Sequence, residues 1–343
     1  MSVARRFPLL GRLVVGVLIG GLVGGCSAGG GPAAAPPQGA APGSPTVAGG
    51  AAGTTRPSAD AAPARPSPVA PTAAPARSFA VGVRKITVVR EGRRLPTTLW
   101  YPATGATGGA ARSGVPVAAG RFPIVVFSHG LRGLPDYYAA LTTRWAAAGF
   151  VVAAPAYPGT NAHADPFDVT DVGQQPLDAA AVISKVRGLD TKLGDPLRGR
   201  LATGRVGAAG HSAGGFTTLG MLSAPTRDER VDAAIVIAGA SLGGTFAGPA
   251  ASVLFVHGSD DGTVALSGAR TAYQKLSWPK GFLTLTGQGH GDYLRPGNRG
   301  FDQVNATTTD FWRATLYGDA AARRRLPANA RKSGVSTYDS SRL

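Results

Sequence analysis

The sequence predicts an α/β fold with a mostly parallel, doubly wound sheet that is flanked by helices and carries no large cap domain. Short β-type runs alternate with helical patterns between residues 79 and 318, the order expected when helices connect parallel strands. Runs such as FPIVVFS at 122–128 are continuously apolar, as in strands that are buried on both faces. The segment between the strands expected at 233–239 and 252–258 is too short to hold an inserted cap domain.

The first expected elements are two strands at 79–90 and 95–101, which form a meander at the sheet edge. After the buried strand at 122–128, a helix from about Asp136 to Ala147 ends at Gly149, a common helix stop. A loop rich in Pro, Gly and Asp covers residues 155–175. The other strands are expected at 150–155, 205–210, 233–239, 252–258 and 281–285, and the other helices at 177–187, 214–222, 267–276 and 302–316.

The N-terminus has the order of a secretory signal. Three arginines at positions 5, 6 and 12 precede the apolar run 13–19, and small residues follow up to Cys26. The tetrapeptide Val-Gly-Gly-Cys ending at Cys26 resembles a bacterial lipobox, in which the cysteine is lipidated and becomes the first residue. We therefore expect residues 1–26 to be a signal peptide with a lipobox, and the mature protein to be extracytoplasmic, anchored in the cell membrane or secreted. A short transmembrane anchor with an incidental cysteine is the alternative.

Composition divides the rest of the chain into three parts. Residues 27–78 consist almost entirely of Ala, Gly, Pro, Ser and Thr, so we expect a disordered tether that has too little apolar surface to fold. Residues 79–318 are expected to form one α/β domain, and residues 319–343 a basic C-terminal tail.

The net charge of +16 does not point to nucleic acid. Residues 79–318 carry 23 basic and 16 acidic side chains, and the basic ones are scattered without a stripe or interleaved aromatics. Association with an anionic cell envelope explains the excess charge more economically. Because Cys26 is the only cysteine, the predicted domain has no disulfide, no cysteine nucleophile and no thiolate metal site.

The pattern G-x-S-x-G, typical of serine hydrolase nucleophiles, occurs three times, around Ser27, Ser212 and Ser241. Ser27 lies beside the lipobox, and Ser241 is followed by a loop rich in Gly and Pro. Only Ser212 stands where a buried strand turns directly into a helix, with small neighbours that such a sharp turn requires. This turn also presents the next backbone N–H to an oxyanion. Ser212 is therefore the predicted nucleophile.

A serine nucleophile needs a base and a carboxylate that orients it. Asp260 and Asp261 follow the strand expected at 252–258, and His290 follows the strand expected at 281–285. The order Ser, Asp, His and the placement of all three after parallel strands match the way open α/β sheets build their sites. His211, directly before Ser212, is expected to serve packing or hydrogen bonding.

These motifs resemble those of the α/β-hydrolases, specifically the dienelactone-hydrolase-like, platelet-activating-factor-acetylhydrolase-like and cutinase-like polyester hydrolases. The resemblance covers roughly residues 80–318. It implies that Asp261 rather than Asp260 is the acid and that the Leu131 and Ala213 amides form the oxyanion hole. It also implies that His129 shapes the oxyanion loop and is not the base. It is carried by VVFSHGLRG at 125–133, GHSAGG at 210–215, GSDDGTV at 258–264 and GHGDY at 289–293.

The chain departs from these families in three respects. The dienelactone hydrolases use a cysteine nucleophile, many relatives have Asp where this chain has Ala156, and many secreted polyester hydrolases have a C-terminal disulfide.

We therefore expect a serine-dependent carboxylic ester hydrolase that forms an acyl-enzyme at an open cleft. Its substrate would be a small-molecule, lipid or polymeric ester. We expect a monomer that uses no cofactor, metal or nucleic acid and that reaches the membrane through its lipid anchor. An acyltransferase or thioesterase on the same fold, and a non-catalytic surface-binding lipoprotein, are the alternatives.

Overall fold

The computed structural model describes residues 68–241 and 243–343. The predicted signal peptide, Cys26, Ser27 and most of the predicted tether lie outside the described residues. Contacts divide the chain into Met1–Ser67 and Pro68–Leu343, and the second unit is the one described below. No helix within the described part is long and apolar enough to cross a membrane.

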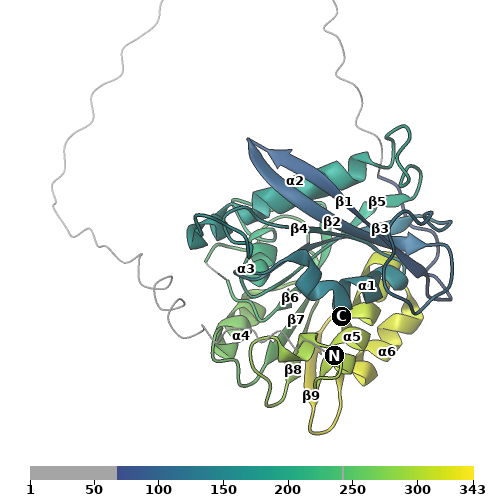
Figure 1. Cartoon of the computed structure of the whole chain (residues 1–343). Helices are drawn as coiled ribbons and strands as arrows, with labels where there is room; N and C mark the ends of the chain where they lie inside the picture. The colour runs from purple at the N-terminus through teal and green to yellow at the C-terminus, as the bar shows by residue number, and fades with distance from the viewer. Residues whose placement is uncertain (1–67, 242) are drawn as a thin grey trace, which may run out of the picture. The chain divides into compact units, whose positions relative to one another are not determined.

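The second unit is built on one nine-stranded sheet with the strand order β1-β2-β4-β3-β5-β6-β7-β8-β9 (Figure 1). The pairs from β4 to β8 are parallel, whereas β1–β2, β2–β4 and β8–β9 are antiparallel. The predicted mostly parallel sheet is thus confirmed. The strands are β1 (Ala80–Arg90), β2 (Arg93–Ala103), β3 (Phe122–Ser128), β4 (Val151–Pro155), β5 (Leu201–His211), β6 (Val231–Ile237), β7 (Ser252–Gly258), β8 (Lys280–Leu285) and β9 (Ser336–Ser341).

Helices cover both faces of this sheet, as the continuously apolar strands require. Within β3 every residue is buried, and Val125 and Val126 belong to the hydrophobic clusters on opposite faces. One cluster contains residues of α2 (Gln175–Gly188), α3 (Ala213–Gly220) and α4 (Leu266–Lys275). The other contains residues of α1 (Ala139–Ala147), α5 (Phe301–Trp312) and α6 (Ala320–Ala330), and includes the edge-to-face pair Trp145 and Trp312.

Residues 238–241 and 243–251, which connect β6 to β7, contain no helix. The structure therefore has no cap domain at this position, as predicted.

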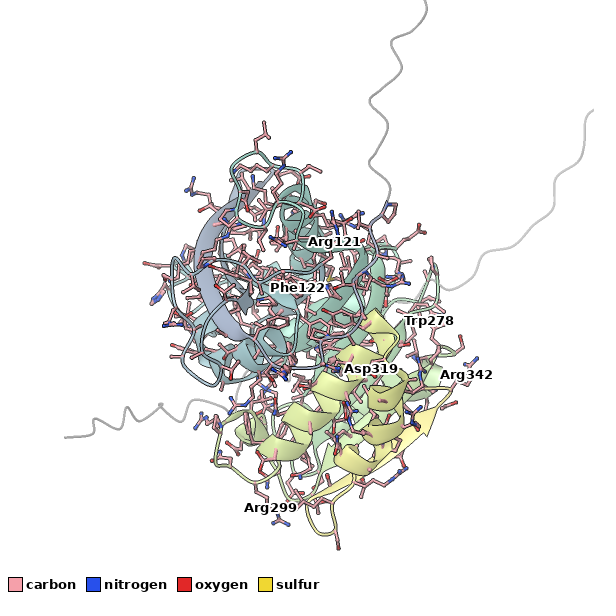
Figure 2. The ribbon with its side chains drawn as sticks, turned by 90° about the vertical axis from the view of Figure 1, so that its right-hand side faces the viewer. Arg121, Phe122, Trp278, Arg299, Asp319 and Arg342 are labelled. Carbon is pink, nitrogen blue, oxygen red and sulfur yellow. The ribbon has the colours of Figure 1, made fainter. Side chains whose placement is uncertain are left out.

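The C-terminal prediction was wrong. Residues 319–343 form α6 and β9 instead of a tail, and β9 pairs along β8 at the sheet edge. Asp319 caps α6 by accepting hydrogen bonds from the Ala321 and Ala322 amides, and Figure 2 shows it at the start of this helix. Tyr338 of β9 is buried against the sheet.

The last part of the predicted tether also packs on the domain. Val69 N donates to Thr203 Oγ1, and Val69 O accepts from Gly204 N. Pro75 O accepts a hydrogen bond from Arg313. The folded unit therefore begins at Pro68, eleven residues before the boundary expected from composition.

Candidate active site

The predicted site residues gather at one edge of the sheet. Ser212, Asp261 and His290 follow β5, β7 and β8, and Leu131 follows β3. These strands are parallel to one another, so their carboxyl ends lie at the same edge, where open α/β sheets bind ligands.

Ser212 occupies a strained turn between β5 and α3. Its φ is 57° and its ψ −121°, a backbone conformation that residues other than glycine rarely adopt. The Ser212 amide donates to Ile237 O at 2.9 Å, and Ser212 O accepts from the Gly215 amide at 2.8 Å. The backbone on both sides of the serine is therefore fixed, and its side chain is only partly buried.

Glycines let the backbone pack closely around this turn. A Cβ added to Gly210 would lie 2.1 Å from Gly214 O, and one added to Gly214 would lie 2.0 Å from Ser128 O. Real Cβ atoms do not approach backbone oxygens so closely. The small residues that sequence analysis noted around Ser212 are thus required by contacts within the turn and with the end of β3.

Asp261 and His290 form a hydrogen-bonded pair. His290 Nδ1 lies 2.8 Å from Asp261 Oδ2, and the His290 side chain keeps 20% of its surface exposed while that of Asp261 has none. The two loops that carry them are also joined, because the Asp260 amide donates to Gln288 O at 3.0 Å. An ionised acid that binds Nδ1 leaves Nε2 of the imidazole as the free, basic nitrogen.

A second histidine faces the acid. His257 Nε2 lies 2.8 Å from Val264 O and 3.3 Å from Asp261 Oδ2, so this nitrogen carries a proton that both oxygens share. The other carboxylate oxygen, Oδ1, accepts from the Thr263 and Val264 amides. Burial acts to raise the pKa of Asp261, but the hydrogen bonds from His257 and His290 outweigh it and hold the pKa well below its ordinary value. The carboxylate is therefore ionised and fully hydrogen-bonded.

The loop after β3 lies directly against the serine. A Cβ added to Gly130 would be 3.1 Å from Ser212 Cβ. His129 holds this loop through both ring nitrogens: Nδ1 donates to Gly130 O, and Nε2 accepts from the Tyr157 amide. Desolvation lowers the pKa of His129 to about 4, so the ring is neutral near pH 7 and shapes the loop, as the resemblance implied.

Two amides beside Ser212 have no acceptor. Within residues 68–241 and 243–343, neither Leu131 N nor Ala213 N donates a hydrogen bond, whereas Arg132 N donates to Thr160 O. Ala213 N directly follows the serine, and Leu131 N directly follows Gly130, which lies against Ser212. Both amides are thus candidates to bind an oxyanion. No hydrogen bond joins Ser212 Oγ to His290 in this structure, a contact that free hydrolases often form only with substrate.

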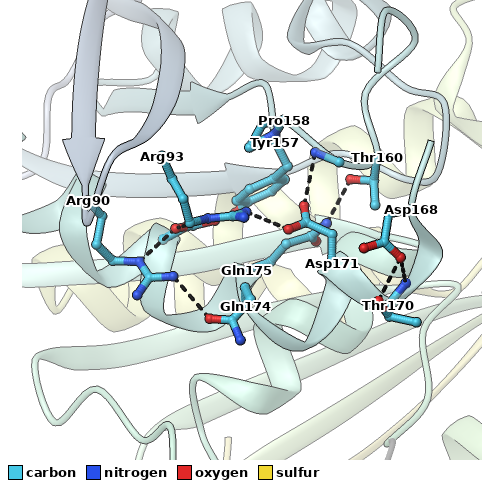
Figure 3. Close-up of polar contacts among 12 residues, drawn as sticks. Arg90, Arg93, Tyr157, Pro158, Thr160, Asp168, Thr170, Asp171, Gln174 and Gln175 are labelled. Carbon is cyan, nitrogen blue, oxygen red and sulfur yellow. Dashed lines mark hydrogen bonds and ion pairs between the residues drawn. The ribbon is translucent and has the colours of Figure 1, made fainter. Parts of the chain in front are cut away.

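A polar network supports the site from the side of the β1–β2 hairpin (Figure 3). Arg93 pairs with Asp171, which accepts from the Gly159 amide. Gln175 donates to Thr160 Oγ1 at 2.8 Å and accepts from Thr217 Oγ1 of α3 at 2.6 Å. Because Thr160 O accepts from the Arg132 amide, this chain of contacts connects the helix after Ser212 with the loop that contains Leu131.

The other candidates lie apart from this arrangement. Ser241 Oγ donates to Gly243 O, and no described helix begins beside it. Asp260 is exposed and accepts from Ser259 Oγ. In the described residues, no group of three His, Cys, Asp or Glu side chains could hold a metal ion.

Sequence reasoning missed two residues of the site, His257 and Tyr138. His257 precedes Asp261 by four residues at the end of a buried strand, a position that could have drawn attention to it. Tyr138 Oη contacts Gly130 N and His211 Nδ1, but nothing in its local sequence indicated a partner 73 residues away.

Part of the chain matches a known family. Residues 75–175 match the model of the family described as platelet-activating factor acetylhydrolase, isoform II. This segment includes β1 to β4 and Leu131, and it ends before Ser212, Asp261 and His290. None of the curated proteins matches the chain. With the topology described above, the match identifies the fold as that of the α/β-hydrolases and supports a hydrolase of the general esterase or lipase type.

Proposed function

We propose that this chain is a serine-dependent carboxylic ester hydrolase that works through an acyl-enzyme. The observation that carries the proposal is the 2.8 Å contact between Asp261 and His290 at the sheet edge where Ser212 adopts its positive φ. A structural role would explain a buried acid–histidine pair, but it would not explain a strained serine beside two unused amides.

In the proposed first step, Ser212 Oγ attacks the ester carbonyl carbon while His290 Nε2 takes the hydroxyl proton. The Leu131 and Ala213 amides bind the oxyanion that forms on the carbonyl oxygen, each contributing roughly 3–4 kcal/mol to transition-state stabilisation. Asp261 stays ionised and stabilises the imidazolium through Nδ1–H. The tetrahedral intermediate collapses as the C–O bond breaks, and His290 gives its proton to the leaving alcohol.

In the second step, water replaces the alcohol. His290 Nε2 takes a proton from water as the hydroxide oxygen attacks the acyl-enzyme carbonyl, and the same amides bind the new oxyanion. Collapse of this intermediate breaks the bond to Ser212 Oγ, which recovers the proton from His290. The products are an alcohol and a carboxylic acid, and no cofactor takes part.

The connection between β6 and β7 bears on the substrate class. The absence of a cap in the described connection between β6 and β7 favours an open cleft, which suits bulky, lipid or polymeric esters as well as short acyl groups. The matched family is named for acetyl hydrolysis of platelet-activating factor, so that compound belongs in the test panel.

Hydrolysis of p-nitrophenyl esters from C2 to C16 by the purified protein tests the proposal, with platelet-activating factor as an added substrate. Turnover with saturation kinetics is expected for at least one ester, together with a pre-steady-state burst of one nitrophenol per protein if deacylation is slow. Absence of turnover for the whole panel would contradict the proposal. Product analysis with an added alcohol separates hydrolysis from acyl transfer, and thioesters test the thioesterase alternative.

The alternative function without catalysis is that of a surface-binding lipoprotein. It predicts that a fluorophosphonate probe does not label the protein, whereas the esterase proposal predicts one label per chain.

The cellular location is proposed from sequence alone, because residues 1–67 lie outside the described part. We propose export and lipidation of Cys26, with the protein outside the cytoplasm. Metabolic labelling with a fatty acid should mark the protein and not its Cys26→Ser variant, and labelling of both would contradict lipidation at this residue.

A further inference from the structure

Tyr138 connects the two segments that flank the predicted nucleophile. It ends the short 3-10 helix η2 (Pro135–Tyr138), and its Oη lies 3.1 Å from Gly130 N and 2.9 Å from His211 Nδ1. Gly130 immediately precedes Leu131, and His211 immediately precedes Ser212. The Tyr138 ring is held in place by Phe127, with ring centroids 4.7 Å apart.

The chemistry of these groups fixes the direction of both hydrogen bonds. The Gly130 amide can only donate, so Tyr138 Oη accepts from it. Desolvation raises the pKa of Tyr138 to about 12, so the phenol keeps its single hydrogen. Donation of this hydrogen to His211 Nδ1 leaves one unpaired group, the Nε2–H. The reverse direction would leave two, because the phenol hydrogen and Nε2 would both lack partners.

His211 is therefore a neutral imidazole with its proton on Nε2. Desolvation, followed by the nearby His290, lowers its pKa well below the ordinary value; Asp261 opposes this shift and His257 adds to it. Its Nε2 is buried and has no hydrogen-bond partner among the described residues. The ring lies against His290, with centroids 4.8 Å apart, and Nε2 faces Gly291, where an added Cβ would approach it to 2.7 Å.

We propose that Tyr138 and His211 act together as positioning residues for the oxyanion loop and the base, an inference that rests on the proposed esterase function. Tyr138 occupies the Gly130 amide, so the loop presents the Leu131 amide alone to the substrate. His211 accepts the hydrogen bond from the phenol. This bond connects the loop to the residue directly before Ser212. The uncharged ring of His211 supports His290 without opposing the positive charge that His290 gains during the reaction.

This arrangement predicts an effect on transition-state binding more than on substrate binding. In the purified full chain, Tyr138→Phe and His211→Leu should each lower kcat about tenfold or more while KM changes less than about twofold, because a misplaced oxyanion donor acts mainly in the transition state. The double variant should fall little further than the worse single variant, since both changes remove the same contact.

Tyr317→Phe is the matched control. The Tyr317 hydroxyl likewise bonds to a backbone atom, here by donating to Gly149 O, but Gly149 lies just before β4, at the opposite edge of the sheet from Ser212. It should lower the unfolding temperature about as much as Tyr138→Phe while leaving kcat unchanged.

Two further variants keep the test independent of folding losses. Asn places a side-chain oxygen near the position of Nδ1, whereas Gln places one near Nε2. His211→Asn should thus keep kcat within about threefold of the unmodified protein, and His211→Gln should resemble His211→Leu. Equal losses for Asn and Gln, or strictly multiplicative losses in the double variant, would overturn the proposal.

A readout without activity separates this inference from the proposed function. Nitrogen-15 NMR of the unmodified protein should show His211 Nδ1 unprotonated and Nε2 protonated, a pattern that Tyr138→Phe alters. If the protein shows this tautomer of His211 but hydrolyses no ester, the esterase function is refuted, whereas the hydrogen bond between Tyr138 and His211 is confirmed. The opposite tautomer in an active enzyme would refute the positioning role alone.

Discussion

Asp261 Oδ2 lies 2.8 Å from His290 Nδ1, although the two residues are 29 positions apart and follow different strands. The adjacent Asp260 is exposed and bonded to Ser259. A single position thus separates a buried, ionised carboxylate that holds an imidazole from an ordinary turn residue.

This difference predicts opposite results for two matched substitutions. Asp261→Asn should lower kcat about 10³- to 10⁴-fold, because the amide no longer holds the imidazole in the required tautomer or stabilises its charge. Asp260→Asn should leave kcat within about twofold. Steady-state kinetics on the best ester of the panel measures both, and a large loss for Asp260→Asn alone would reassign the acid.

His257 should act through Asp261. His257→Leu removes the N–H group that lies between Asp261 and Val264 O, and it leaves that buried carbonyl without its donor. We therefore expect a loss of about 1–3 kcal/mol in unfolding free energy. We also expect about a tenfold loss in kcat. His257→Gln can present an N–H near Nε2 and should recover most of both losses. If Gln is no better than Leu, His257 contributes packing alone.

The turn at Ser212 should not accept larger neighbours. Gly214→Ala places a Cβ 2.0 Å from Ser128 O, a backbone atom that cannot move without disturbing β3, and should lower the unfolding free energy by several kcal/mol. Gly188→Ala in α2 meets nothing within 4 Å and should be neutral or stabilising by about 0.5–1 kcal/mol. Urea unfolding of both variants compares them. Equal stability would show that the turn is looser than described.

Buried neutral histidines should make the domain less stable in weak acid. The pKa of His129 is lowered to about 4 and that of His211 well below the ordinary value of about 6.5. Between these folded values and about 6.5 the unfolded chain binds more protons, so the free energy of unfolding falls as the pH drops through this interval. The slope is at most about 1.4 kcal/mol per pH unit for each histidine.

Urea unfolding between pH 7 and pH 4.5 measures this slope. His129→Asn should reduce it, because the variant has no buried imidazole at this position that must take up a proton on unfolding. An unchanged slope in His129→Asn would mean that His129 takes up its proton over the same pH range in the folded and the unfolded state.

The sequence was most informative where burial is continuous. β3 and β7 begin and end where the apolar runs do, because strands covered on both faces contain little else. The C-terminal elements were missed for the opposite reason. In α6 only Ala322, Leu326 and Ala330 are buried, beside three arginines and an internal proline, and β9 is an edge strand with two buried residues. Such narrow stripes do not distinguish a packed element from a polar tail.

The same limit applies to the site. Motif order and strand ends predicted where Ser212, Asp261 and His290 would lie, because parallel strands bring their carboxyl ends to one edge. The contact between Tyr138 and His211 depends on how η2 packs over the end of β5, and hydrophobic periodicity carries no information about such a long-range polar pair.

The most direct measurement is to map the adduct of a fluorophosphonate probe by mass spectrometry in the purified protein and in two serine variants. We expect one adduct on the peptide that contains Ser212, no adduct in Ser212→Ala, and full labelling of Ser212 in Ser241→Ala. An adduct on Ser241, or labelling that persists in Ser212→Ala, would contradict the assignment of the nucleophile. No labelling of the unmodified protein would contradict the proposed catalysis as a whole.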